Sequence, residues 1–203
     1  YLESADSRAT TETLLLRLKL AGIVRDRQAG TRALDKLLDG RTLSAQQLSS
    51  VSASLQPGLP DRLVLALSRA RTSAGVALPS DRMDLAWAAW NRKDYRDASE
   101  QVQAHLRSDP GNLDALRLMA NIAGKLQGER AARTWLERAL AQTPRLSRLR
   151  IELLEQLDRK KEAVALVEEL RTQSPGDRNL AVIHARLLIA NGQPGRAQQV
   201  LQP

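Results

Sequence analysis

The sequence predicts an all-α fold, a superhelical solenoid of about twelve antiparallel helices in about six pairs. Three observations support this prediction. Prolines recur at positions 110, 144 and 175, with spacings of 34 and 31 residues. An apolar ladder with steps of three or four residues precedes each proline and therefore lies on one helix face. Small residues recur twelve positions apart, where two antiparallel helices would cross most closely.

Composition excludes several classes of site. The 203 residues include no cysteine, which removes disulfides and thiolate metal ligands. Lysine and arginine number 31 against 23 acidic residues, which gives a net charge of +8. Only 2% of the residues are aromatic, so leucine, alanine and valine must form the core. No apolar run approaches the roughly 18 residues of a membrane span, and no signal peptide is visible.

Residues 80–203 show the repeat most clearly. Proline ends the second helix of each pair, because it lacks an N–H and restricts the residue before it. The ladders before the three prolines are Ala98, Val102 and Leu106; Ala132, Leu136 and Leu140; and Ala163, Val167 and Leu170. A second helical stripe lies upstream of the ladders. We therefore predict repeats at about 80–110, 111–144, 145–175 and 176–203.

These repeats resemble the tetratricopeptide repeat (TPR). The pattern is carried by Ala86, Ala98, Asp94-Tyr95 and Asp109-Pro110, then by Ala120, Ala132, Ala139, Leu140 and Pro144, and again by Ala185, Gly192 and Ala197. It is weaker over 145–174, where Ile151 occupies the place of the small residue, and the family's large aromatic in the first helix is absent. The resemblance implies a right-handed superhelix whose first helices line a concave, peptide-binding groove.

Residues 1–79 predict divergent, less regular helical repeats. A buried helix over about 9–24 is indicated by Leu14, Leu15, Leu16, Leu18, Leu20 and Ile23. Its partner, which Gly40 ends, is indicated by Ala33, Leu34, Leu37 and Leu38. Ser44 is the expected N-cap of a helix to about residue 54. After a break at 56–60, a further helix reaches about residue 73, and Gly75 to Pro79 break the chain again.

The two ends of the chain predict a fragment of a longer protein. The chain begins at Tyr1 rather than methionine, and its last helix is cut at Pro203 without a capping helix. We expect the two halves to form one continuous solenoid. Because the uncapped ends of such an array expose its core, we expect that copies of the chain can associate through these ends.

No constellation for catalysis or metal binding is visible, so we expect no enzyme, no cofactor and no metal. The chain has neither a phosphate-binding glycine loop nor clustered metal ligands. His105 and His184 are far apart and are expected to be ordinary helix histidines. The carboxylate pairs Glu168-Glu169 and Asp81/Asp84 are expected on solvated helix faces.

The resemblance places a partner-binding groove on the first helices of the repeats. Its expected residues are Met83, Trp87, Trp90, Arg117, Asn121, Lys125 and Arg186. Trp87 and Trp90 are helix neighbours that either anchor a peptide or pack between adjacent first helices. Trp135, on a second helix, is expected in the core.

One part of this groove is similar to the carboxylate-clamp repeats that hold chaperone C-termini. Arg117 and Asn121 have the spacing of the clamp's basic residue and asparagine. The clamp also needs an asparagine on the following repeat, where this chain reads Leu149-Arg150-Ile151-Glu152. An ordinary solvated face is therefore the better interpretation of this segment.

The densest basic patch consists of Arg130, Arg133, Arg138, Arg145, Arg148 and Arg150. Such a patch could attract an acidic partner or a phosphate backbone. The shortage of stacking aromatics argues against nucleic acid. Arginine richness together with high alanine and leucine is also typical of a GC-rich bacterial genome.

The leading functional hypothesis is a non-enzymatic scaffold or adaptor that binds partner protein segments in its groove. Divergent arrays of this kind occur in bacterial envelope proteins, including periplasmic exopolysaccharide-export factors and lipoprotein adaptors, so we favour the periplasm over the cytoplasm. The alternative is a basic groove that binds an anionic polymer such as an exopolysaccharide. Salt dependence separates the two, because polymer binding weakens steeply with ionic strength.

Overall fold

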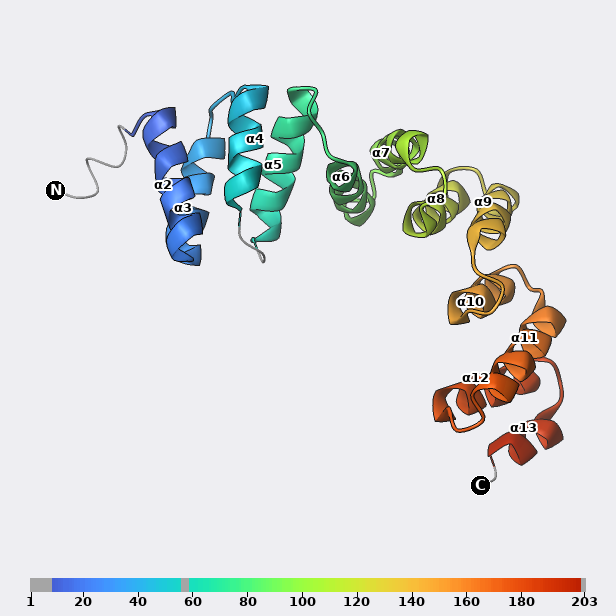
Figure 1. The fold of residues 1–203 in the computed structure, drawn as a ribbon. Coiled ribbons are helices and arrows are strands. Elements are labelled where there is room, and N and C mark those ends of the chain that lie inside the picture. The colour runs from blue at the N-terminus through green and yellow to red at the C-terminus, as the bar shows by residue number, and fades with distance from the viewer. Residues whose placement is uncertain (1–8, 56–58, 202–203) are drawn as a thin grey trace. The chain divides into compact units, whose positions relative to one another are not determined.

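Residues 9–55 and 59–201 are described by a computed structural model of the chain (Figure 1). These residues form twelve α-helices and no strand, and most consecutive helices within each unit pack against one another. The first six helices are α2 (Thr11–Val24), α3 (Arg27–Leu38), α4 (Ala45–Ser54), α5 (Asp61–Ser73), α6 (Pro79–Asn91) and α7 (Tyr95–Ser108). The other six are α8 (Leu113–Leu126), α9 (Glu129–Gln142), α10 (Arg148–Gln156), α11 (Lys160–Gln173), α12 (Arg178–Ala190) and α13 (Pro194–Leu201). The predicted all-α array of helix pairs is confirmed.

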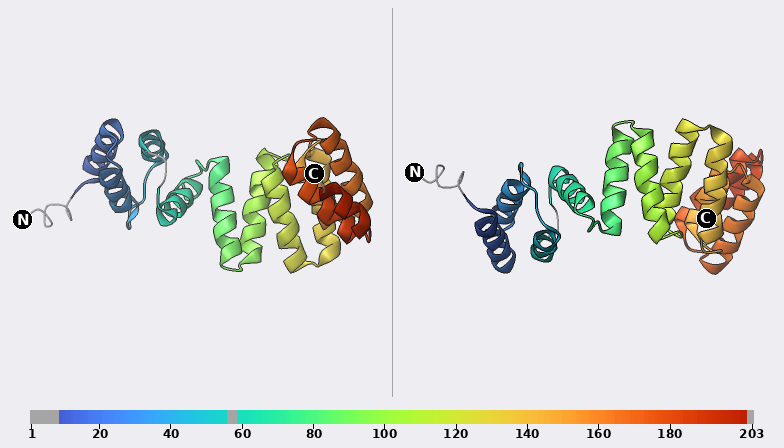
Figure 2. Two further views of the ribbon diagram at one scale, coloured as in Figure 1. Left: turned by 90° about the horizontal axis from the view of Figure 1, so that it is seen from below. Right: turned by 90° about the horizontal axis from the view of Figure 1, so that it is seen from above.

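The chain divides into two compact units, residues 1–108 and residues 109–203. Within each unit, short turns join antiparallel neighbours such as α6 and α7, or α8 and α9 (Figure 2). None of the helices in the described ranges has both the length and the apolar character needed to cross a membrane.

The first unit has a leucine-rich core between α2, α3, α4 and α5. Its buried residues are Leu14, Leu18, Ala33, Leu34, Leu37, Leu43, Leu48, Val51, Leu63 and Leu67. The predicted N-cap of α4 is confirmed, because the Ser44 hydroxyl accepts from the Gln47 N–H and the Gln47 side chain accepts from the Ser44 N–H. The predicted break at 56–60 lies partly outside the described residues, and α5 begins directly after it.

The prediction for α2 is wrong in part. The sequence indicated that α2 is buried, yet Leu16, Leu20 and Ile23 are exposed, while Leu14 and Leu18 are fully buried. The physical reason is that the large apolar residues of α2 are spread over several of its faces. Only one of its faces packs against α3 and α4.

The second unit follows the predicted repeat. Its helices α9 and α11 end two residues before Pro144 and Pro175, and Gly192 after α12 has a φ of +73°, which is the left-handed conformation that ends helices. Ile151 at the small-residue position is buried, and α10 still packs against α11. The bulkier side chain therefore belongs to the core of this unit.

Candidate functional site

A cleft lies between α5 and α6 in the first unit, beside the predicted groove residue Trp87. Its volume is about 200 Å³, and its lining residues are Asp61, Val64, Leu65, Asp84, Trp87, Ala88 and Asn91. The Trp87 side chain is 44% exposed. A large aromatic side chain that stays exposed at the edge of a cleft is a suitable anchor for a partner.

Helix periodicity explains why these residues meet. Asp84, Trp87, Ala88 and Asn91 follow the spacing that keeps side chains on one face of α6, and the residues from α5 follow the same spacing. Proline at position 79 starts α6, where its missing N–H costs nothing. The two faces then form the two walls of the cleft.

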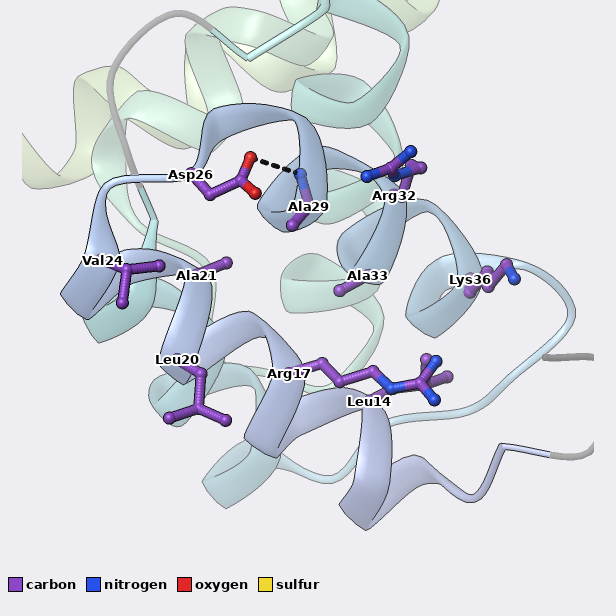
Figure 3. A pocket seen from close by; sticks show the side chains of 10 residues that line it. All are labelled: Leu14, Arg17, Leu20, Ala21, Val24, Asp26, Ala29, Arg32, Ala33 and Lys36. Carbon is purple, nitrogen blue, oxygen red and sulfur yellow. Dashed lines mark hydrogen bonds between the residues drawn. The ribbon is translucent and has the colours of Figure 1, made fainter. Parts of the chain in front are cut away.

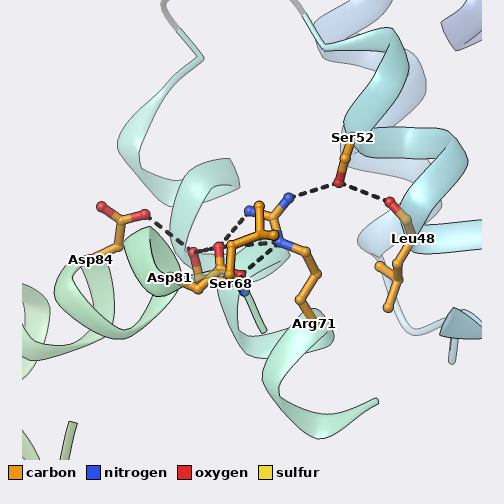
Figure 4. Close-up of polar contacts among 7 residues, drawn as sticks. Leu48, Ser52, Ser68, Arg71, Asp81 and Asp84 are labelled. Atoms are coloured by element: carbon orange, nitrogen blue, oxygen red, sulfur yellow. Dashed lines mark hydrogen bonds and ion pairs between the residues drawn. The ribbon is translucent and has the colours of Figure 1, made fainter. Parts of the chain in front are cut away.

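A buried polar network fixes α6 against α5 beside the cleft (Figure 4). The Arg71 Nε donates to Asp81 Oδ2 at 2.9 Å, and Arg71 Nη1 donates to the Ser52 hydroxyl on α4 at 2.9 Å. Asp81 also accepts from the Leu78 N–H at 2.7 Å, which caps the start of α6. Ser68 on α5 donates to Asp81 at 3.0 Å. The network therefore connects three helices around one ion pair.

The expectation that Asp81 and Asp84 lie on a solvated face is wrong for Asp81, which is fully buried. Burial of the Asp81 carboxylate is possible because it accepts from the Leu78 N–H at the start of α6 and pairs with Arg71. Asp84 is half-buried, and burial raises the pKa of its carboxyl above the ordinary value. The nearby charge of Asp81 also raises this pKa, while the hydrogen bond from Ser68 and the charge of Arg71 lower it.

The other two aromatic or sulfur-containing candidates on α6 do not line the cleft. Trp90 is half-buried and packs against Tyr95 of α7, with ring centroids 5.1 Å apart. Met83 is half-buried on α6. The structure therefore separates Trp87, which faces the cleft, from Trp90, which packs at the turn between α6 and α7.

In the second unit, ion pairs connect the first helices of successive repeats. Arg117 on α8 contacts Glu152 on α10 at 3.4 Å, and Arg186 on α12 contacts Glu155 on α10 at 2.8 Å. These exposed pairs each contribute little to stability, but they compensate two of the predicted groove charges. Asn121 and Lys125 are exposed on α8. Glu152 belongs to the segment in which the carboxylate clamp needs an asparagine, and it contacts Arg117, the arginine of the similar pair.

The six arginines of the predicted basic patch have different environments. Arg145 pairs with Glu169, and Arg148 pairs with Asp177. Arg150 donates to the backbone oxygens of Leu140 and Thr143 at the end of α9, where a cation is favourable. The Arg138 guanidinium lies 4.5 Å from the ring centroid of Trp135, which is half-buried rather than in the core. Arg130 and Arg133 are exposed on α9.

Both histidines are buried and have structural contacts. His105 Nδ1 lies 2.9 Å from the Pro79 carbonyl oxygen and therefore donates to it, which links α7 to the start of α6. His184 Nδ1 lies 3.1 Å from an Arg171 nitrogen, which can only donate, so the His184 ring is neutral in this contact. Burial lowers the pKa of His184, and the charge of Arg171 lowers it as well, while Glu168 raises it.

The lowered pKa of His184 predicts a loss of stability at mildly acidic pH. Below the ordinary histidine pKa of about 6.5, the unfolded chain binds a proton that the folded chain does not bind. The contribution of neutral His184 to stability is therefore fully present above this value. It is lost as the pH falls toward the lowered pKa. We expect the urea midpoint of the wild type to fall more between pH 7 and pH 5.5 than that of His184→Gln. Equal decreases in the two proteins would contradict this assignment.

A metal site is not visible in the described ranges, where no group of three or more histidine, aspartate or glutamate side chains could hold an ion. Sequence reasoning missed Asp61, Val64 and Leu65, the α5 wall of the cleft. Their three- and four-residue spacing is an available signal, but only the structure shows that this face lies against Trp87.

Comparison with known proteins gives a likeness in structure alone. No protein-family model and no curated protein matches the sequence. A tetratricopeptide repeat protein from Parabacteroides merdae superimposes with a TM-score of 0.56 at 14% identity, over 94% of this chain and 77% of that one. A thermophilic TPR protein from Thermus thermophilus gives a TM-score of 0.46 at 18% identity, over 89% of this chain and 100% of that one.

The superposition on the Parabacteroides protein covers nearly the whole chain. In this chain the helices follow one another in packed pairs, and most of the predicted small residues are buried. The resemblance stated from the sequence is confirmed at the level of the fold. The chain therefore has the helical-repeat fold of a tetratricopeptide repeat protein.

Proposed function

We propose that the chain is a non-enzymatic scaffold that binds a segment of a partner protein at the cleft beside Trp87. The observation that supports this proposal is the exposed indole of Trp87 at a preformed cleft. The chain has only three tryptophans, and the exposed part of Trp87, 44% of its surface, does not stabilise the core. Burying it against a partner would remove a large apolar surface from water.

The charge of the cleft indicates the chemistry of the partner segment. Asp61 and Asp84 line it, and neither carboxylate forms an ion pair within the described residues. A lysine or arginine of the partner would meet these carboxylates and the face of the Trp87 ring. We infer that the segment carries a cationic side chain next to an apolar one. This cleft is thus acidic although the whole chain is basic.

The second unit offers further contact residues to a partner. Asn121 and Lys125 are exposed on α8 and can donate hydrogen bonds. Arg117 and Arg186 are paired with glutamates, so they would contribute only by exchanging partners. We propose these four as secondary contacts, and the exposed Arg130 and Arg133 of the basic patch as contacts for an acidic region of the partner.

Replacing Trp87 by alanine is expected to weaken capture of the partner at least tenfold, because truncating an aromatic anchor commonly costs about 2 kcal/mol or more. The measurement is a quantitative pull-down with the chain from extracts of its source organism. Trp135→Ala is the matched control, since Trp135 lies on α9 of the other unit. Circular dichroism would show that both variants remain helical.

The outcomes of this pull-down are distinct. A protein that is retained by wild type and by Trp135→Ala, and lost with Trp87→Ala, supports the proposal. Recovery of polysaccharide or nucleic acid that elutes with salt would support binding of an anionic polymer instead. If Trp87→Ala and Trp135→Ala retain the partner equally well, Trp87 does not belong to the binding surface.

We further propose that the scaffold works in the bacterial envelope, in export or as an adaptor. The support for this setting is the resemblance of these divergent alanine-, leucine- and arginine-rich repeats to arrays that occur in bacterial envelope proteins. Fractionation of the source cells with an antibody against the chain tests it. Recovery with cytoplasmic markers alone would contradict it.

A further inference from the structure

The outward face of α2 carries the largest group of exposed apolar side chains on one helix in the described part of the chain. Leu16, Leu20, Ile23 and Val24 are 58%, 51%, 69% and 69% exposed. Single exposed apolar residues are ordinary, but a contiguous group marks an interaction surface. These residues follow helical spacing, so they form one stripe along α2.

The stripe borders a pocket between α2 and α3, of about 380 Å³ (Figure 3). Leu20 and Val24 form its α2 edge, and the small residues Ala21, Ala29 and Ala33 line its floor. The lining residues extend over about three turns of α2 and about two turns of α3. Small side chains between two helices leave a groove into which the ridge of a third helix can pack.

The charges around this pocket are mostly positive. Arg17, Arg32 and Lys36 line it, against the single acidic residue Asp26. The Asp26 carboxylate accepts from the Ala29 N–H at 3.0 Å and so serves as the N-cap of α3. In Figure 3, Arg17 and Lys36 lie at the end of the pocket away from Val24. The end near Val24 therefore combines apolar side chains with Asp26, and the other end is cationic.

We propose that this α2–α3 surface binds one amphipathic helix of a partner protein, with acidic residues beside its apolar stripe. The apolar stripe of the partner would cover Leu20 and Val24, and its carboxylates would meet Arg32 at the cationic end. Length, shape and charge of the groove fit the recognition of a helix through positions i, i+3, i+4 and i+7. The surface shares no residue with the Trp87 cleft and acts independently of the function proposed for it.

The test is a selection from a displayed library of 18-residue amphipathic peptides on the full chain. The peptides carry leucine at the apolar positions and glutamate, lysine, glutamine or alanine at the flanking positions. Selected peptides are then synthesised with a fluorescent label and titrated by anisotropy. We expect enrichment of glutamate on one flank, and an affinity that falls as salt is added.

Two variants locate the binding. Leu20→Gln/Val24→Gln is expected to weaken the selected peptide at least tenfold, because it removes the apolar edge. Arg32→Gln is expected to weaken glutamate-flanked peptides more than their glutamine-flanked versions. The control Leu146→Gln/Leu201→Gln changes two exposed leucines of the second unit and should leave the affinity unchanged.

Several outcomes would overturn the proposal. Enrichment of peptides with lysine at the flanking positions would show that the surface prefers a basic helix, contrary to the proposal. Equal binding to the wild type and Leu20→Gln/Val24→Gln would place the site elsewhere. A wild-type dimer that Leu20→Gln/Val24→Gln dissociates, detected by light scattering, would assign the surface to a second copy of the chain.

Discussion

Replacing Arg71 by methionine is expected to lower the free energy of unfolding by about 3–5 kcal/mol, the cost of breaking a buried ion pair. Arg71 and Asp81 are both buried, and the variant would leave the Asp81 carboxylate without its cation. Ser52 would also lose its donor from Arg71. Urea unfolding followed by circular dichroism measures the effect.

Two further variants separate the ion pair from simple packing. The double variant Arg71→Met/Asp81→Leu should recover at least half of the loss, because no charge then remains buried without a partner. Arg62→Met is the matched surface control, since Arg62 pairs with Asp35 at 2.6 Å while both side chains are exposed. We expect it to cost at most about 1 kcal/mol. A similar loss of unfolding free energy for Arg71→Met and Arg62→Met would contradict the claim that burial makes the Arg71–Asp81 pair important for stability.

Replacing Ile151 by alanine is expected to destabilise the second unit by about 2–5 kcal/mol, the range for truncating a large core side chain. The repeat pattern alone predicts the opposite, since alanine is the usual small residue at this position. In the structure Ile151 is only 1% exposed and belongs to the core that includes Leu153 and Leu157. The truncation would therefore leave a cavity.

A matched control exists on the same unit. Ile189 on α12 is 60% exposed, and its replacement by alanine should change stability by at most about 0.5 kcal/mol. Comparison of the two urea midpoints tests the account of α10. A neutral or stabilising effect of Ile151→Ala would mean that the helix crossing at α10 and α11 follows the ordinary repeat after all.

The ends of the helices were predictable from the sequence because local chemistry decides them. Prolines stop α9 and α11, and Ser44 caps α4 through its own hydroxyl. The repeat period was visible for the same reason, since apolar ladders follow the helical turn. Trp87 as a groove residue came from the resemblance, and its exposure agrees with such a role.

The tertiary surroundings of single residues were not predictable from local patterns. The burial of Asp81 depends on Arg71, ten residues away, and the outward face of α2 depends on which side α3 and α4 cover. Glu152 contacts Arg117 across 35 positions. The α5 wall of the cleft was missed because residues 1–79 show no regular repeat, although Asp61 and Val64 follow helical spacing.

The measurement that tests the central claim most directly is photo-crosslinking from the cleft in living cells of the source organism. A photoreactive residue would replace Asn91, which lines the cleft and is exposed, and Ala165 on α11 would serve as the exposed control position. The account predicts that position 91 crosslinks to a defined protein segment with a lysine or arginine, and that Trp87→Ala abolishes the product. No protein adduct at position 91, or an adduct that persists in Trp87→Ala, would contradict it.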